Sequence, residues 1–226
     1  PMHEAYPGRV IDVGIAEAEA VASAAGMAYQ GAHPVVALYA TFLNRGFDQL
    51  LMDVALHRAG VTFVLDRAGV TGADGASHNG VWDIAMCSII PGLRLAAPRD
   101  EETLRARLRE ALDVDDAPTV IRYRKGALPE PMPAVRSVGG VDILFDEAVD
   151  GSSARVLIVG TGACAPDAIE AARRLSAGGV SVTVADPQWM IPVCPELATL
   201  ARDSDCVVSV EDGIVQGGFG WSLRDA

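Results

Sequence analysis

The strongest constraint on the fold is the alternation of short β-branched runs with helical patterns along the first half of the sequence. The runs occupy residues 10–13, 34–40, 61–66, 93–97 and 119–123. The helical patterns occupy about 16–29, 44–58 and 100–112. Parallel strands need long crossover connections, which are usually helices. The alternation therefore predicts an α/β domain with a parallel sheet over residues 1–126.

A second, shorter alternation begins after a stretch rich in proline and glycine. Strand-like runs at 155–160, 180–186 and 206–212 enclose a helical pattern to about residue 175 and a short one near 196–201. The stretch between the two alternations loses periodicity and predicts a linker over residues 127–152. The expected fold class is α/β, with two doubly wound open-sheet domains, the second of them over residues 153–226.

Composition and charge narrow the classes of function. With 50% hydrophobic residues, a chain of 226 residues can fill a real core. The net charge of -12 disfavours a nucleic-acid partner, so any phosphate must be held by a few placed Arg and Lys side chains. The four cysteines have wide spacings typical of neither a zinc site nor a disulfide framework.

Localisation and completeness follow from the ends of the sequence and its apolar runs. The chain shows no signal peptide, and no apolar run approaches the roughly 20 residues that a membrane span requires. We therefore expect a cytoplasmic protein without a membrane partner. Because it opens at Pro1 and closes at Ala226 soon after a glycine-rich turn, we expect a fragment or an incompletely ordered subunit.

Two segments after expected strands form a candidate ligand site. The glycine-rich loop at 66–80 carries Asp66, Arg67, Asp74 and His78, and Tyr39, Phe42 and Arg45 follow the preceding strand. Ligands of open α/β sheets bind at such loops. Taken singly, each residue also has an ordinary structural interpretation, such as a solvated loop histidine or an Asp-Gly turn.

Glu17 stands at the start of an expected helix among apolar neighbours. Ile11, Val13, Ile15 and Val21 predict an interior position for it. A carboxylate in a dry pocket is suited to proton chemistry. The alternative is that an acidic residue in a helix's first turn is favoured by the helix dipole whatever its function.

The second unit contains a weak dinucleotide-binding pattern. Gly160, Gly162 and Ala165 form a small-residue turn after a strand, and Asp186 lies at the end of the next strand. This arrangement is typical of nicotinamide-binding domains, but any tight β-to-α turn also favours small residues. A nicotinamide-binding domain therefore remains an alternative.

Five segments together carry a resemblance to a known family. They read DVGIAEAEAVASAAG (12–26), YATFLNRGFDQ (39–49), DRAGVTGADGASHNG (66–80), AAPRDEETLR (96–105) and RYRKG (122–126). In this order and spacing the chain resembles the deoxyxylulose-phosphate synthase family of the transketolase superfamily. The resemblance implies a pyrimidine-binding domain over residues 1–126, lacking its N-terminal part, and an incomplete transketolase C-terminal domain.

The same resemblance implies cofactors, partners and an activity. The cofactors are thiamine diphosphate and Mg²⁺; the metal and the diphosphate are held by an N-terminal domain or a separate subunit, and no residue of this chain binds the metal. The assembly would be a homodimer or a heterotetramer. The activity would be decarboxylation of pyruvate and transfer of the two-carbon unit to glyceraldehyde phosphate, and this chain alone would be inactive.

Residue roles follow from the resemblance position by position. Glu17 would contact N1' of the aminopyrimidine and favour the imino tautomer that activates the cofactor, Ile15 would lie beside the ring, and Phe42 would stack on it. Asp74 and His78 would be catalytic, contacting hydroxyls or passing protons. The remaining residues, which would bind substrate, are Tyr39, Arg45, Arg67 and Lys125.

Two departures from the family pattern leave the substrate open. Ala18 and Glu19 stand where the family has glutamine and histidine, and Arg124-Lys125 stands where it has Pro-Arg. Lysine keeps the positive charge but loses the planar fork of arginine. The alternatives are a subunit of a split transketolase-like enzyme with another ketose donor or aldehyde acceptor, or a catalytically silent scaffold.

Overall fold

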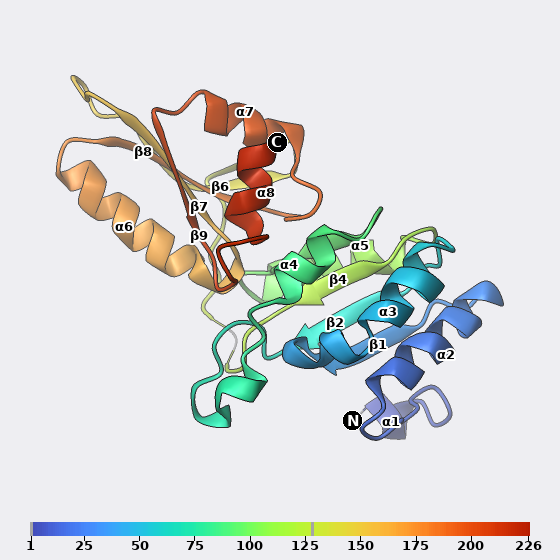
Figure 1. Ribbon diagram of the computed structural model, residues 1–226. Coiled ribbons are helices and arrows are strands. Elements are labelled where there is room, and N and C mark those ends of the chain that lie inside the picture. Colours follow the sequence, from blue (N-terminus) through green and yellow to red (C-terminus); the bar gives the residue numbers. More distant parts are fainter. Residues whose placement is uncertain (1, 128) are drawn as a thin grey trace.

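The computed structural model describes residues 2–127 and 129–226 as two α/β units packed side by side (Figure 1). The first unit is built on a four-stranded parallel sheet in the order β1-β2-β4-β3. Its strands are β1 (Val35–Tyr39), β2 (Thr62–Asp66), β3 (Arg94–Ala96) and β4 (Thr119–Arg122). The parallel sheet predicted from the alternation is confirmed.

Helices cover both faces of the first sheet. On one face, α2 (Glu17–Tyr29) and the helical segment after β1 pack on Phe63, Leu65 and Val120. On the other, α5 (Glu101–Leu112) covers Ala96 and Ile121. Consecutive strand residues point to opposite faces, which is why Val120 and Ile121 belong to different layers. Asp100 begins α5 with a capping box, because its side chain accepts from the Thr103 backbone N–H at 2.9 Å.

The second unit contains a mixed five-stranded sheet in the order β5-β6-β8-β7-β9. The parallel strands are β7 (Arg155–Gly160), β8 (Ser181–Pro187) and β9 (Cys206–Val210), and β6 runs antiparallel to β8. Figure 1 shows α6 (Ala165–Ala177) along one face of this sheet and α7 (Pro195–Arg202) and α8 (Phe219–Asp225) on the other. Both sheets are therefore doubly wound, as expected.

The expected linker at 127–152 differs from the structure. It contains β5 (Arg136–Val138) and β6 (Val141–Glu147), which pair as a hairpin and extend the second sheet. The apolar run from Val141 to Phe145 supplies the strand, and Gly139 and Gly140 form the turn with positive φ angles of 53° and 86°. The prolines that suggested a linker lie before the hairpin, and the two glycines form its turn.

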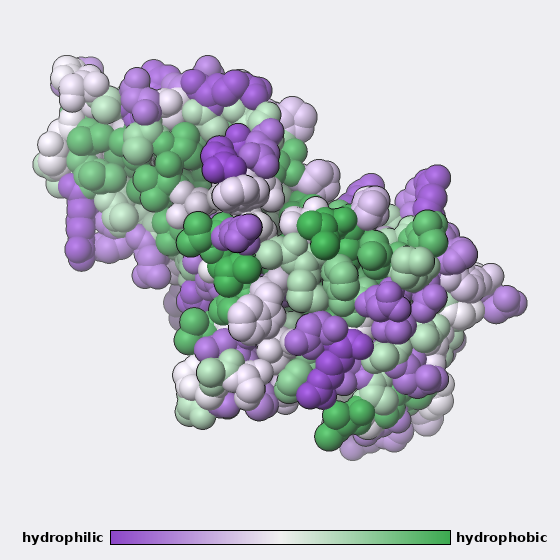
Figure 2. All heavy atoms as spheres, viewed as in Figure 1, coloured by the Kyte–Doolittle hydropathy of each residue, from purple (hydrophilic) through white to green (hydrophobic). Residues whose placement is uncertain are grey.

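The expected strand at 10–13 is wrong. These residues adopt no regular structure, and Ile11 is 64% and Ile15 90% exposed. Figure 2 shows hydrophobic side chains on the surface around the N-terminal segment, at the lower edge of the view. The interior expected around Glu17 is thus built in this chain by Val21 but not by Ile11, Val13 or Ile15.

Other helical boundaries also differ from expectation. The single helix expected at 44–58 is a succession of a 3₁₀ turn, η1 (Ala40–Arg45), a short α3 (Phe47–Gln49) and a π-helical turn, η2 (Leu50–Ala55). Two short helices, α1 (Met2–Ala5) and α4 (Asp83–Ser88), lie in segments without a clear helical pattern. Phe42 and Arg45 lie in η1, which begins directly after β1.

The two units share one hydrophobic core. Residues of the first sheet pack in one cluster with Ile143, Leu157 and Ala185 of the second. Backbone hydrogen bonds join them as well, since the Leu95 N–H donates to the Ile191 carbonyl at 3.0 Å and the Met190 N–H donates to the Leu95 carbonyl at 2.7 Å. The junction is therefore a packed interface rather than a hinge.

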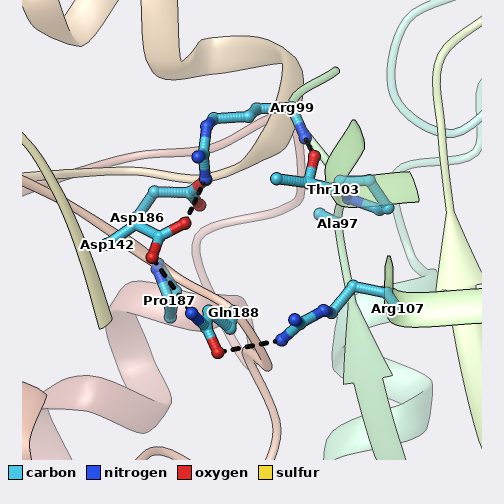
Figure 3. Close-up of a pocket in the computed structure, with 9 residues that line it drawn as sticks. Ala97, Arg99, Thr103, Arg107, Asp142, Asp186, Pro187 and Gln188 are labelled. Carbon is cyan, nitrogen blue, oxygen red and sulfur yellow. Dashed lines mark hydrogen bonds and ion pairs between the residues drawn. The ribbon is translucent and has the colours of Figure 1, made fainter. Parts of the chain in front are cut away.

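A buried charge cluster lies at the same junction (Figure 3). Arg99 of the first unit donates from Nη1 to Asp142 at 2.7 Å and to Asp186 at 2.9 Å in the second unit. Ser137 and Gln188 also donate to Asp142, which keeps the pKa of that carboxyl below its usual value although burial opposes them. Burial raises the pKa of Asp186 to about 7, and the attraction of Arg99 does not offset it.

Candidate functional site

The candidate site lies at the carboxyl edge of the first sheet. Tyr39, Asp66 and Arg122 are the last residues of β1, β2 and β4, so the segments that follow these strands leave the sheet at one edge. An open cleft of about 250 Å³ lies there, lined by Tyr39, Arg67, Asp74 and His78. These four residues were all singled out in the sequence, and the fold brings them together.

Arg67 lines the cleft in an unusual backbone conformation. Its φ of 60° lies in the left-handed region, which residues other than glycine rarely adopt. Such backbone conformations are often found at functional sites. Its guanidinium lies over the Tyr39 ring, 3.9 Å from the centroid, and pairs with Asp66. Its Nε is also 3.6 Å from an Asp74 oxygen. The arginine is therefore held on three sides.

Asp74 joins Arg67 to Lys125 across the cleft. The Lys125 ammonium donates to both Asp74 oxygens, at 2.7 and 2.9 Å. This hydrogen bond is the main cause that holds the pKa of Asp74 below its usual value, and the charge of Arg67 adds to it. Arg67 and Lys125, two of the three cations that the resemblance assigns to substrate binding, are thus paired with carboxylates of the same chain.

An aromatic group forms the adjoining wall. The Phe42 ring lies nearly parallel to Tyr39, with centroids 6.0 Å apart, and meets the His78 ring edge-on at 5.4 Å. The Arg45 guanidinium lies over Phe42, 4.6 Å from its centroid. A planar ring stacked on that face of Phe42 would therefore take the place of Arg45.

Glu17 is linked to this group through Arg45. Its carboxylate is 13% exposed and lies 3.6 Å from Arg45 Nη1, beyond hydrogen-bond distance. Within residues 2–127 and 129–226 it accepts no hydrogen bond. Gly46 permits this placement, since a Cβ there would lie 2.8 Å from Val21 Cγ2 and 3.3 Å from the Glu17 carbonyl oxygen. The result is a mostly covered carboxylate that has an ion pair with Arg45 but no hydrogen bond among the described residues.

Ile15 is the one predicted cofactor-contact residue that the fold leaves apart. It is 90% exposed, in the irregular segment before α2, and its contact with a cofactor stays a prediction. Sequence reasoning also missed Asp212 of the second unit, which accepts hydrogen bonds from Arg122 and Arg124 of the first. The signal that could have found it is an acidic residue just past the carboxyl end of a strand-like run, Cys206–Val210.

The space beside the glycine turn of the second unit is occupied by residues of the first unit. A Cβ at Gly162 would lie 2.9 Å from the Ala97 carbonyl oxygen, and Asp186, the acidic residue of the pattern, is 3% exposed and bonded to Arg99. A dinucleotide at this turn would have to separate the two units. The geometry therefore disfavours the nicotinamide-binding alternative.

Three further features of the chain concern membranes, metals and disulfides. None of the helices in the described ranges is long and apolar enough to cross a membrane. Among the same residues, no three His, Cys, Asp or Glu side chains cluster as metal ligands would. All four cysteines are free thiols.

Two family models match the chain, one for each unit. Residues 2–131 match "Transketolase, pyrimidine binding domain", and residues 148–226 match "Transketolase, C-terminal domain". The first match covers more than half of the chain.

Curated relatives carry the name 1-deoxy-D-xylulose-5-phosphate synthase. Synthase 2 of Kitasatospora griseola is 57% identical over 228 residues, which cover 100% of this chain and 36% of the relative. The synthase of Corynebacterium glutamicum (strain R) is 54% identical over 98% of this chain and 35% of its own length. The chain thus spans about a third of the relatives it matches.

Solved structures show the same architecture. A chain described as "Split gene transketolase, inactive beta4 tetramer" superposes with a TM-score of 0.81 at 29% identity, covering 98% of this chain and 71% of that one. Transketolase from Leishmania mexicana superposes with a TM-score of 0.74 at 24% identity, over 90% of this chain and 31% of that one, and supports the fold alone.

Proposed function

The chain belongs to the transketolase family, whose pyrimidine-binding and C-terminal domains it carries, and from this premise we propose that it supplies one half of a thiamine-diphosphate site. The identity to deoxyxylulose-phosphate synthases supports pyruvate as the two-carbon donor and glyceraldehyde phosphate as the acceptor. The other half, which binds the diphosphate and Mg²⁺, belongs to an N-terminal domain or a separate subunit. The split-gene transketolase among the structural neighbours supports the arrangement with separate subunits.

The residues present suit the aminopyrimidine end of thiamine diphosphate. The ring needs a hydrogen-bond partner at one edge and an aromatic face beside it, and Glu17 and Phe42 offer these in one connected group. The Glu17 carboxylate, mostly covered and without a hydrogen bond among the described residues, is the observation that carries the proposal. A carboxylate largely shielded from water would be poorly placed without a ligand, because it has lost hydration and gained no hydrogen bond in return.

When bound, the cofactor supplies the nucleophilic carbon that decarboxylates a 2-oxo acid and transfers the remaining two-carbon unit. Glu17 holds or shares a proton at the ring nitrogen that it faces, and its low exposure strengthens that interaction. Phe42 orients the ring. Arg45, which lies between them, screens the Glu17 charge until the ring arrives.

The cleft residues bind the aldehyde acceptor. Arg67 and Lys125 contact its phosphate, and Asp74 and His78 contact hydroxyls or move protons during bond formation. Because Asp74 now neutralises Lys125, a phosphate must take over Lys125 from Asp74 as it binds. Asp74 is then released to act on the substrate.

Substitution of Glu17 tests the proposal. In the complete enzyme, with the diphosphate-binding domain present, Glu17→Gln should lower kcat about 100-fold to 1,000-fold, since a positioned proton-transfer group contributes about that much. Glu170→Gln is the matched control, because Glu170 is exposed on α6 and bonds only to Arg174 on its own helix among the contacts described. Its kcat should stay within about twofold of the parent.

A Glu17→Gln enzyme with normal turnover would contradict the mechanism and favour the silent scaffold. Thermal unfolding of both variants should match the parent, because neither substitution removes a buried hydrogen bond. This measurement separates a loss of chemistry from a loss of fold.

A second candidate function is a transketolase subunit with a ketose donor or another aldehyde acceptor. The lysine at position 125 favours it, because a lysine that is already paired with Asp74 binds phosphate less firmly than a forked arginine would. Product formation from pyruvate with glyceraldehyde phosphate supports the synthase. Product formation from ketose donors alone supports the second candidate.

A further inference from the structure

Asp212 connects the second unit to the segment that carries Lys125. It follows β9, its side chain is 8% exposed, and it accepts from Arg122 Nη1 at 2.5 Å and from Arg124 Nε at 3.0 Å. Both arginines belong to the first unit, and Lys125 comes immediately after the second of them. One carboxylate of the C-terminal unit therefore holds the turn that leads into the cleft.

Arg122 makes this connection costly to break. It is 3% exposed and neutralised by two carboxylates, one from each unit: Asp212, and Asp83 at 2.7 Å from its Nε. Burial alone would raise the pKa of Asp212, but the two guanidiniums outweigh it and hold that pKa below its usual value. A buried arginine that loses one partner is strongly disfavoured, so the two units stay aligned at this point.

Asp212 also touches the loop that carries Arg67. A Cβ on Gly69 would overlap Asp212 Oδ2, so the carboxylate fits against the loop backbone only because residue 69 is glycine. Gly69 has a φ of 76°, and its N–H donates to the Gly80 carbonyl at 2.8 Å. Asp212 therefore lies against the loop two residues after Arg67.

Arg124 is anchored to the second unit at two points. Besides its bond to Asp212, its Nη2 donates to Cys164 Sγ at 3.2 Å. Lys125, the next residue, reaches the other way to Asp74. The backbone between Arg122 and Lys125 is therefore fixed by the second unit on one side and by the cleft on the other.

We propose that Asp212 is a positioning residue that sets the separation of Arg67 and Lys125, so that the C-terminal unit tunes how the cleft binds an anionic ligand. The residues that line the cleft all come from the first unit, and Asp212 acts on them only through Arg122, Arg124 and Gly69. The inference rests on the proposed function only for the identity of the ligand, a phosphorylated aldehyde.

The first test needs no activity. Carboxyl NMR titration of this chain should report Asp74 with a pKa below its usual value, because Lys125 donates to it. Asp212→Asn should raise that pKa toward the value measured in Lys125→Ala, which removes the donor altogether. Asp205→Asn is the control: Asp205 precedes the other end of β9 and accepts from the Arg155 backbone, and its loss should leave Asp74 unchanged.

The second test uses the complete enzyme. Asp212→Asn should raise KM for glyceraldehyde phosphate about 5-fold to 50-fold, the range of typical coupling between sites, with kcat within about twofold. KM for unphosphorylated glyceraldehyde should not change. The double variant with Lys125→Ala should lose less affinity than the two single effects combined, because Asp212 acts in part through Lys125.

A third variant guards against misfolding of Asp212→Asn. Arg124→Gln removes one of the two bonds to Asp212 at a side chain that is 40% exposed, and it should shift the Asp74 pKa and KM in the same directions. An unchanged Asp74 pKa in the folded variants, or an equal rise of KM for both aldehydes, would overturn the inference. If Asp74 shifts while the parent enzyme makes no product, the proposed function fails and the inference stands.

Discussion

At the scale of single residues, the Lys125–Asp74 pair decides how the cleft recognises phosphate. The pair has to open before Lys125 can serve a ligand, and its two hydrogen bonds are of ordinary length, 2.7 and 2.9 Å. A lysine offers a point charge, whereas arginine can bond to a carboxylate and a phosphate at once through its fork. The family's arginine at this position would therefore not need to leave Asp74 completely.

We predict that Lys125→Arg lowers KM for glyceraldehyde phosphate about threefold to tenfold, and that Lys125→Ala raises it about tenfold or more, as expected for charge-assisted hydrogen bonds. Initial rates of the complete enzyme check both. Unphosphorylated glyceraldehyde is the control substrate, and its KM should be the same in all three enzymes. A Lys125→Ala enzyme with unaltered KM for the phosphorylated aldehyde would remove Lys125 from the binding site.

The sequence predicted the residues that line the cleft, but it did not predict the residues that hold them in place. Tyr39 ends β1, and Arg67 and Asp74 follow β2. They come together because the carboxyl ends of both strands meet the same edge of the sheet. Asp212 was missed because its partner Arg122 is 90 positions away, and no local pattern records such a pair. Ile15 was expected beside a cofactor, but the chain itself provides no cover for it.

At the scale of elements, local sequence patterns predicted strands correctly where the strand lies inside a parallel sheet. The strands β2 and β4 have neighbours on both sides and are largely buried on both faces, which is why near-continuous apolar runs identified them. Residues 10–13 have a similar composition without a neighbouring strand to pair with. The hairpin β5–β6 was hidden by its surroundings, because the breakers on both sides carried more weight than the short apolar run between them.

The contacts between α5, β6 and β8 predict a pH dependence of stability. Arg99 faces Asp142, Asp186 and, at 3.8 Å, Asp100, so one cation cannot neutralise all three carboxylates. Asp186 takes up a proton most readily, since its Oδ1 has no hydrogen-bond partner within the described residues. Its pKa in the folded chain, raised by burial to about 7, exceeds the unfolded value, so the stability it contributes is complete below about pH 4 and is lost as the pH rises through about 7.

Asp186→Asn, which imitates the protonated form, should therefore gain stability relative to the parent between pH 5 and pH 8. Urea unfolding at the two pH values measures the difference. Asp142→Asn is the control, because the pKa of Asp142 is lowered and its contribution is already complete at pH 5. An Asp186→Asn effect that is the same at both pH values would show that Asp186 is ionised throughout.

At the scale of the whole molecule, the shared core makes the two units one folding unit. Leu65, Leu95 and Ile143 belong to a single buried cluster, although they come from different sheets. The first unit also depends on the second for the carboxylates that neutralise Arg99 and Arg122. Separating the units would expose apolar surface, take Asp142 and Asp186 away from Arg99, and leave Arg122 with Asp83 alone.

We predict a single unfolding transition for the full chain and a much less stable first unit in isolation. Trp82 lies in the first unit and Trp221 in the second, while Trp189 of the second unit bonds to Glu110 of the first. Tryptophan fluorescence and far-ultraviolet circular dichroism should therefore give the same midpoint. A fragment of residues 1–131 should melt roughly 10 °C or more below the full chain, given about 2–4 °C per kcal/mol. Two resolved transitions in the full chain would contradict a shared core.

The pairing of every cleft cation with a carboxylate also shapes how a ligand arrives. The chain carries a net charge of -12, and Arg45, Arg67 and Lys125 are each matched by an acidic neighbour, so no local positive potential offsets the overall repulsion of an anion. The electrostatic energy of a sugar phosphate that diffuses toward this chain therefore rises until the two are in contact. Added salt shortens the range of that repulsion to about 10 Å at 0.1 M and should speed the encounter, the reverse of ordinary electrostatic steering.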